Sequence, residues 1–319
     1  MLAFTCSLLL AATAAVPAAP TPADLARLTP PDAQVVMGIH VAALRSHPAV
    51  QAWLANHQAP WTGRGSEAEA LLEELGLDPL RDVDASVLAA VDRPGEEDSW
   101  VLLLGGSFNP TAMSAALTRR GATLVPGMSY PLLRTSEETD DAPLMAFFDH
   151  LVVVGDERSV LAAASGATMG AGVVRVERAA GRLDPTATSW LVVDIPPALR
   201  QNPQVIDGAP EAMRGLLSAS RAVERMIMHA RLGEALELSG WARADAPENA
   251  ELLHDAAKGM VAALRLSAQG HYPELLEVLR QVRITQSERE VTGTAAIPLA
   301  LIEQLAEAAA QSARRPTER

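Results

Sequence analysis

Apolar residues in the first half of the chain occur in short runs that predict β-strands, most of them joined as hairpins. Gln34–Val41 is the first such run, and its length is typical of a strand. Ser86–Asp92 and Trp100–Gly105 are two more, and the acidic stretch with Pro and Gly between them predicts a hairpin turn. Three further strands are expected at Tyr130–Thr135, Pro143–Phe148 and Leu151–Gly155.

Segments with helical spacing of apolar residues lie between these strands. Ala42–His57 carries apolar residues three and four positions apart, as an amphipathic helix does. Ser66 begins a second helix with a capping-box pattern, and Gly76 would end that helix in a left-handed conformation. Asn109 and Pro110 predict the start of a third helix, because Asn caps free N–H groups and Pro fits the first helical position.

The second half of the chain repeats this succession. Trp190–Ile195 predicts a strand and Glu211–Ser218 a helix. Val223–Leu232 alternates between apolar and polar residues, and Ala235–Ala244 runs back after a Gly-Glu turn, so the two predict a hairpin with one apolar face. Pro247–Leu266 predicts a long helix. The expected elements after it are a helix at Pro273–Arg280, a hairpin of Val282–Gln286 with Glu290–Ile297, and a last helix from Pro298.

The shared order of elements predicts a tandem duplication of one α+β unit, with domains at 28–178 and 185–312. Hairpins that alternate with single helices are typical of two similar halves of mostly antiparallel sheet with helices packed on one face. The small residues of Gly166–Gly172, together with Arg178–Pro185, indicate the boundary between the halves. The sequence leaves open whether the halves form two sheets or one.

The N-terminus predicts an export signal. Leu2–Val16 is almost wholly apolar or small, and such a run is shorter than a membrane span but fits a signal-peptide core. We therefore expect residues 1–19 to be a cleaved signal peptide of a periplasmic or secreted protein. Lipidation at Cys6 is disfavoured because Ala3–Thr5 fits a lipoprotein signal poorly, and a buried N-terminal helix is the alternative. Residues 313–319 are expected to be a disordered tail.

Composition and charge limit the classes of function. Hydrophobic residues make up 49% of the 319 residues, as in a globular protein. The net charge of −13, without a dense basic cluster, argues against a nucleic-acid partner. Cys6 is the only cysteine and lies in the predicted signal, so the mature chain would have no disulfide or reactive thiol. No transmembrane segment is expected in the mature chain, since no later apolar run reaches the length of a membrane helix.

Two short segments carry a resemblance to a known group of proteins. Pro31–Val36 reads Pro-Asp-Ala-Gln-Val-Val at the first predicted strand, and Gly76–Asp82 reads Gly-Leu-Asp-Pro-Leu-Arg-Asp. With the predicted signal peptide and tandem halves, these segments resemble uncharacterised exported α+β proteins of Gram-negative bacteria with GC-rich genomes. The resemblance implies secretion across the inner membrane and the fold outlined above. It implies no activity and no site residues.

The polar residues form no recognisable metal or catalytic pattern. The seven histidines lack HExxH or HxH spacing, and zinc needs three or four convergent ligands, so no metal or other cofactor is expected. Asp78, Asp82 and Asp84 lie in one segment, but they lack the ligand order of a calcium loop. A turn led by Pro79, with Asp residues as caps, explains them better.

Two weak candidates for ligand contact remain. Gly105, Gly106, Ser107 and Asn109 lie where a glycine-rich strand end meets a helix N-terminus, a position at which anions bind. They lack the Lys and the spacing of a phosphate loop, and a plain strand-to-helix turn is the alternative. Trp61 lies in a loop with Pro and Gly and would be an anchor for a partner if exposed; a lid over the core is the alternative.

These observations favour a non-catalytic exported protein with a binding or envelope-assembly role and an unknown protein or small-molecule partner. The alternative is a hydrolase in which a histidine, a carboxylate and a hydroxyl meet in a cleft between the halves. A carrier of small ligands is a third hypothesis, and it predicts a large apolar cavity instead.

Overall fold

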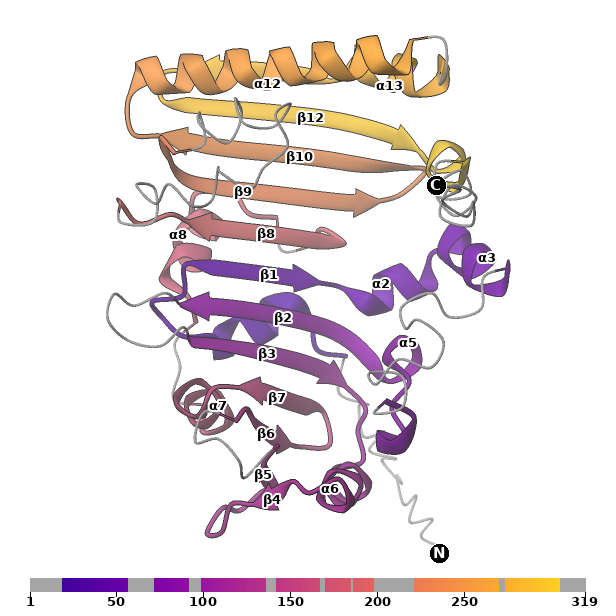
Figure 1. Cartoon of the computed structure of the whole chain (residues 1–319), viewed down its shortest axis with the longest axis vertical. Coiled ribbons are helices and arrows are strands. Elements are labelled where there is room, and N and C mark those ends of the chain that lie inside the picture. The colour runs from indigo at the N-terminus through magenta and orange to yellow at the C-terminus, as the bar shows by residue number, and fades with distance from the viewer. Residues whose placement is uncertain are drawn as a thin grey trace, which may run out of the picture.

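A computed structural model of the protein describes residues 19–56, 72–91, 99–135, 142–166, 170–184, 186–197, 221–269 and 273–304. The molecule is elongated along the direction in which its strands follow one another, with helix α12 (Pro247–Ala268) at one end and strand β4 (Thr123–Leu124) at the other (Figure 1). In these residues, no helix combines the length and the apolar character needed to cross a membrane.

The described strands form one antiparallel sheet, and the fold is α+β as expected. The sheet has 12 strands in the order β11-β12-β10-β9-β8-β1-β2-β3-β7-β6-β5-β4. Besides β4, the strands are β1 (Val35–Ile39), β2 (Val83–Val91), β3 (Ser99–Gly106), β5 (Leu132–Arg134), β6 (Leu144–Phe147), β7 (Leu151–Gly155), β8 (Ser189–Asp194), β9 (Val223–Leu232), β10 (Ala235–Ala244), β11 (Arg283–Ser287) and β12 (Glu290–Pro298).

Apart from α12, the helices in the described residues are short, with ten residues or fewer. They are α1 (Pro22–Leu25), the 3₁₀ turn η1 (Ala26–Leu28), α2 (Val41–Ser46), α3 (Pro48–Asn56), α5 (Pro79–Asp82), α6 (Pro110–Arg119), α7 (Glu157–Ala164), α8 (Gly172–Ala179) and α13 (Pro273–Gln281). Residues 72–75 and 299–304 are also helical.

The sheet continues from one half of the chain to the other, which answers the question that the sequence leaves open. Strand β1 pairs antiparallel with β2 on one side and with β8 on the other. Counted outward from the β1–β8 pair, the order β1-β2-β3-β7-β6 corresponds to β8-β9-β10-β12-β11. Each side therefore has one hairpin next to the central pair and a second hairpin paired onto the first.

Several predicted features are confirmed residue by residue. Strands β9 and β10 have the predicted bounds, and their register places Leu236 opposite Leu232 on one face. Asn109 caps α6, because its side chain accepts a hydrogen bond from the backbone N–H of Ala112. Gly76 has a φ of 64°, the left-handed conformation expected of a residue that ends a helix.

The helix predicted over Ala42–His57 is instead two helices, α2 and α3. His47 ends α2 with extended backbone (φ −74°, ψ 128°), and Pro48 begins α3. A proline ring clashes with helical backbone at the preceding residue, so the chain leaves the helix at His47 and starts again. The prediction of helical structure is therefore right on both sides of the break, but the prediction of one continuous helix is wrong.

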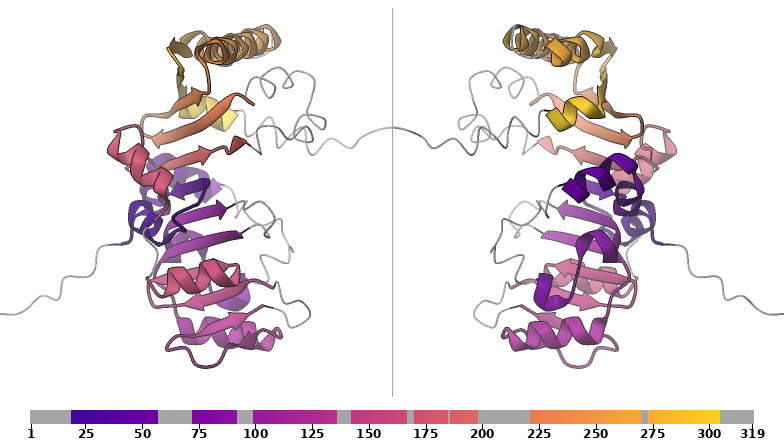
Figure 2. Two further views of the ribbon diagram at one scale, coloured as in Figure 1. Left: turned by 90° about the vertical axis from the view of Figure 1, so that its left-hand side faces the viewer. Right: turned by 90° about the vertical axis from the view of Figure 1, so that its right-hand side faces the viewer.

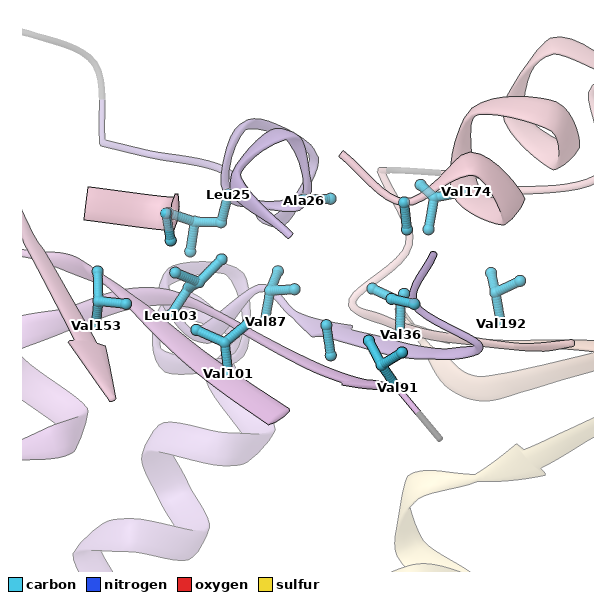
Figure 3. Close-up of a cluster of buried hydrophobic side chains, with 14 of the residues drawn as sticks. Leu25, Ala26, Val36, Val87, Val91, Val101, Leu103, Val153, Val174 and Val192 are labelled. Carbon is cyan, nitrogen blue, oxygen red and sulfur yellow. The ribbon is translucent and has the colours of Figure 1, made fainter. Parts of the chain in front are cut away.

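One surface of the sheet, which we call face 1, carries the larger core. Val87, Val101 and Val153 point to this surface from β2, β3 and β7. Leu25 of α1 lies over this part of the core, and Val174 of α8 lies over Val36 (Figure 3). The same core continues across the β1–β8 pair through Val36 and Val192, which face each other in register (Figure 3). The two halves therefore share one apolar core.

The opposite surface, face 2, has helices of its own, so the expectation that helices pack on one face is corrected. Met113 and Leu117 of α6 pack against Phe147 and Val152, which lie on face 2. Val152 and Val153 are both buried although neighbouring strand residues point to opposite faces. Figure 2 shows that α8 and α1 lie together on the other side of the sheet, which is face 1. A sheet buried on both faces needs helices on both.

The predicted domain limits also differ from the folded body. Leu25 and Ala26 are buried in the face 1 core, so the body begins before residue 28. Between the two segments that indicate a boundary lies α8, a helix that the sequence analysis does not predict. Its Val173 and Val174 join the same core, and the second half pairs directly with the first, so this region connects the halves rather than separating them.

A buried carboxylate fixes α8 to the second half. The Glu177 side chain is 2% exposed, and its two oxygens lie 2.5 Å from Arg225 Nη1 and 3.4 Å from Arg182 Nη1. Burial alone would lower the pKa of Arg225, but hydrogen bonds to Glu177 and Asp194 raise it, so this guanidinium stays charged. Arg182 also stacks 4.7 Å from the Trp241 ring centre. These contacts join α8 to β8, β9 and β10.

Some predictions fall on residues that the structure does not describe. These are most of the predicted signal peptide, Trp61, the predicted helix Glu211–Ser218 and the predicted tail.

Candidate functional site

An apolar groove lies on face 2 at the end of the sheet where β1 leads into α2. Its volume is about 680 Å³. Figure 1 shows α2, α3 and the last helical turn, residues 299–304, together at this end of the strands. The apolar side chains that line it are Ile39, Val41, Leu44, Ala49, Val50, Trp53, Leu72, Leu77, Pro79, Leu80, Val83, Leu104, Leu232, Leu236, Leu299 and Ile302. Both halves of the chain therefore contribute to one groove.

The break between α2 and α3 positions the groove wall. The backbone N–H of Ala49 donates to His47 Nδ1 at 3.3 Å, so the ring proton lies on Nε2 in the neutral form. That Nε2–H donates to the carbonyl of Gly233, 3.0 Å away in the turn between β9 and β10. The hairpin tip, with Leu232 and Leu236 on face 2, is thereby held against the helices of the first half.

The polar residues at the groove offer little to a ligand. Arg45 Nη2 lies 2.6 Å from Asp84 Oδ1, and Arg45 Nη1 lies 2.7 Å from the carbonyl oxygen of Leu80. Its charge is therefore paired, and its donors serve the end of α5. Ser86 and Glu303 are the other polar residues that line the groove in the described part of the chain, and Glu303 is exposed. A ligand inside the groove would meet hydrocarbon almost everywhere.

The predicted aspartate cluster has a structural role in the wall of this groove. Asp78 caps α5 by accepting hydrogen bonds from the N–H groups of Leu80 and Arg81. The pKa of Asp82 is lowered, first by its hydrogen bond from Arg81, in spite of partial burial. Asp84 holds Arg45. Asp78 is thus a cap, as predicted, whereas Asp82 and Asp84 hold Arg81 and Arg45 in place.

A second hollow, which we call the polar recess, lies on face 1 of the second half. Its volume is about 890 Å³. His229 of β9 and Ser239 of β10 lie directly opposite each other, with 3.3 Å between His229 Nδ1 and Ser239 Oγ. Asp184 lies beside them and forms an ion pair with Arg231. The remaining lining residues are Ala187, Glu237, Leu238, Arg280, Gln281, Arg283, Thr294, Ala295 and Ala296.

A histidine, a hydroxyl and a carboxylate thus meet in one recess, but not in the arrangement of a catalytic triad. In a triad, one ring nitrogen takes the proton of the serine and the other donates to the carboxylate. Here the backbone N–H of Asp184 donates to His229 Nε2 at 3.0 Å, so that nitrogen is an acceptor. The ring proton of neutral His229 is then on Nδ1 and points at Ser239. His229 therefore has no free lone pair to activate Ser239.

The charge state of His229 agrees with this hydrogen bonding. Burial lowers the pKa of His229, and the nearby Arg231 lowers it further, while Asp184 acts in the opposite direction. Lowering the pKa favours the neutral ring. The Asp184 carboxylate accepts from Thr186 and Arg231 instead of from the ring.

The glycine-rich strand end has its backbone donors engaged within the chain. The N–H groups of Gly106 and Ser107 donate to the carbonyls of His150 and Asp82 at 3.2 and 2.9 Å. A Cβ on Gly106 would overlap the backbone of Asp82, and a Cβ on Gly105 would lie 2.6 Å from Pro20. Close packing thus accounts for both glycines, and the Asn109 side chain serves as a cap. The glycines, the two N–H groups and the Asn109 side chain thus have roles within the fold, and these contacts add no support to the predicted anion site.

Sequence reasoning did not find the groove, because its lining comes from segments distant in sequence. A local signal for the groove is the pair Leu232 and Leu236. These two large apolar residues flank a hairpin turn, where polar residues are more usual. The recess was equally hidden, since Asp184 and His229 are 45 residues apart.

Comparison with known proteins identifies no relative. The chain matches no protein-family model, and neither a curated protein nor a solved structure is significantly similar to it.

Proposed function

We propose that this protein is a non-catalytic binding protein that takes the hydrocarbon part of an amphiphile, such as a fatty acyl chain, into the apolar groove. The observation that carries the proposal is the composition of the groove, in which side chains from both halves offer hydrocarbon and the one arginine is already paired. Burying apolar surface from water is worth roughly 0.8 kcal/mol per CH₂ group. A long chain would therefore gain affinity without any hydrogen bond.

The size and polarity of the groove favour a hydrocarbon chain over a peptide. Its volume of about 680 Å³ lies within the range of small-molecule sites. An extended peptide would bring backbone N–H and C=O groups, which cost free energy when they are buried without partners. A hydrocarbon chain has no such groups. The polar head of the amphiphile would remain in water at the open side of the groove.

We also propose that the protein acts outside the cytoplasm, as the predicted signal peptide suggests. Amphiphiles are abundant in a bacterial envelope, so an exported carrier would meet its ligand there. N-terminal sequencing of protein recovered from the periplasm is expected to give a start near residue 20. Recovery of the unprocessed chain from the cytosol would contradict export.

We further infer that residues 28–178 and 185–312 descend from one duplicated unit, with α8 now connecting them. The matching strand order on the two sides of the β1–β8 pair supports this inference.

A displacement assay tests the binding proposal. We expect a dansyl-labelled fatty acid to bind the protein saturably with a stoichiometry near one, and unlabelled palmitate to displace it. Leu236→Glu puts a charge into the groove and is expected to weaken binding at least tenfold, because an unpaired charge is costly among apolar groups. Leu252→Glu is the matched control, since Leu252 lies on α12 and is 61% exposed.

Two outcomes would contradict the proposal. One is the absence of saturable binding to the wild-type protein. The other is equal binding to a correctly folded Leu236→Glu variant, with folding checked by circular dichroism.

A further inference from the structure

The polar recess contains a row of hydrogen-bond donors that no part of the proposed function uses. The strand register places Arg283 of β11 opposite Thr294 of β12, Thr294 opposite Ser239, and Ser239 opposite His229. Directly opposite residues share a face, with Cβ atoms about 5 Å apart. Three donor side chains therefore follow one another across face 1, on the back of the hairpin whose face 2 lines the groove.

The tautomer of His229 makes Ser239 a donor towards the recess. Because Nδ1–H of neutral His229 points at Ser239 Oγ, that oxygen acts as the acceptor. The hydroxyl hydrogen of Ser239 is then available for another partner. Thr294 is exposed and has no side-chain hydrogen bond in the part of the chain that the structure describes.

One guanidinium at the recess has no direct partner among the described residues. Arg231 is paired with Asp184 and lies 3.8 Å from Glu237, so both carboxylates face a cation. Arg280 lies 3.4 Å from Glu277. Arg283 has neither an ion pair nor a hydrogen bond among the described residues, and it is exposed.

We propose that the polar recess binds an oxyanion, that is a carboxylate, phosphate or sulfate group of a ligand, through Arg283, Thr294 and Ser239. A planar guanidinium binds such groups in bidentate fashion, and two hydroxyl donors would complete the contacts. The carboxylate nearest His229, that of Asp184, is paired with Arg231, and Glu237 lies 3.8 Å from the same guanidinium. This inference is independent of the proposed function, because the recess and the groove lie on opposite faces of the sheet.

Isothermal titration with inorganic phosphate, sulfate and glucuronate tests the inference on the full chain. At least one of these anions is expected to bind saturably at low ionic strength, and the order of the three identifies which group the site prefers. Arg283→Gln is expected to weaken that binding at least tenfold and Ser239→Ala severalfold. Arg175→Gln is the matched control, since Arg175 is exposed on α8 and is not among the recess residues.

The variants also separate this inference from the proposed function. Arg283→Gln is expected to leave binding of the labelled fatty acid unchanged, whereas Leu236→Glu is expected to leave anion binding unchanged. The inference is overturned if none of the three anions binds, or if Arg283→Gln and Arg175→Gln weaken binding equally, as they would for a general charge effect.

Discussion

His229 illustrates how a single half-buried residue can resemble a catalytic group and yet be a structural one. Its distance to Ser239 is compatible with a serine–histidine pair, but the N–H of Asp184 occupies the nitrogen that a triad directs at the carboxylate. The direction of this hydrogen bond thus determines whether His229 can act as a base towards Ser239. It also makes the neutral ring part of the folded structure, because protonation of Nε2 would set two donors against each other.

This structural role predicts a pH dependence of stability. The pKa of His229 in the folded protein lies below the value of about 6.5 expected in the unfolded chain, mainly because of burial. As the pH falls below 6.5, the unfolded chain therefore binds more protons than the folded protein, and the free energy of unfolding decreases.

His229→Gln is expected to flatten the part of this decrease that lies between pH 7 and 5, measured by urea unfolding at several pH values. His254→Gln is the control, because it removes a different histidine. The same slope in the wild type and in His229→Gln would show that His229 does not cause the dependence.

At the level of elements, the sequence predicts those whose stabilising contacts are local. Strands β9 and β10 each have apolar residues at alternate positions on one face and are joined by a short turn, so their bounds follow from the pattern. The start of α6 follows from Asn109 and Pro110. Helix α8 could not be predicted in this way, because its inward face includes Glu177, a residue that the pattern assigns to solvent. Its partner Arg225 lies 48 residues further along the chain.

The burial of Glu177 predicts a large effect of its removal. Glu177→Ala removes the buried carboxylate that Arg225 and Arg182 share, although the two arginines keep Asp194 and Glu290 as partners. It is expected to lower the free energy of unfolding by about 1.5–3 kcal/mol, because a short hydrogen bond between charged groups is lost. Arg225 retains 27% exposure, which keeps the expected effect below that of a fully buried pair.

Glu277→Ala on α13 is the control, because its pair with Arg280 is more than half exposed and is expected to contribute less than about 1 kcal/mol. Chemical unfolding of both variants gives the comparison. Equal effects would mean that the α8 network does not stabilise the connection between the halves.

At the level of the whole molecule, the continuous sheet and the shared core lead us to expect that both halves unfold as one unit. The sequence gives no signal for the β1–β8 pair, because either strand could equally have been an outer edge of a separate sheet. The groove depends on this pairing, since Leu232 and Leu236 meet the helices of the first half only when the sheets are joined. The order of strands and helices along the chain could thus be predicted in large part, while the groove that distant segments line together could not.

Gly38 tests the central pair directly. It lies opposite Trp190 in β8, and a Cβ there would lie 2.5 Å from the indole ring. Gly38→Ala is expected to lower the free energy of unfolding by about 1–3 kcal/mol through overpacking. Calorimetry is expected to give a single transition at a lower temperature, because both halves unfold together.

The control for this variant is Gly259→Ala in the interior of α12, where a Cβ would meet no atom within 4 Å. It is expected to raise the free energy of unfolding by about 0.5–1 kcal/mol, because alanine favours a helix more than glycine does. Two separate transitions in the wild-type protein, with Gly38→Ala shifting only one of them, would contradict a single folding unit.

The apolar groove is expected above all to be a binding site for hydrocarbon. The most direct measurement is mass spectrometry of organic extracts from protein purified out of the cell envelope under native conditions. We predict an amphiphile with a long hydrocarbon chain in a near-equimolar amount in the wild-type protein, and a strongly reduced amount in Leu236→Glu. A wild-type extract without such a molecule, or equal amounts in the two proteins, would contradict the account.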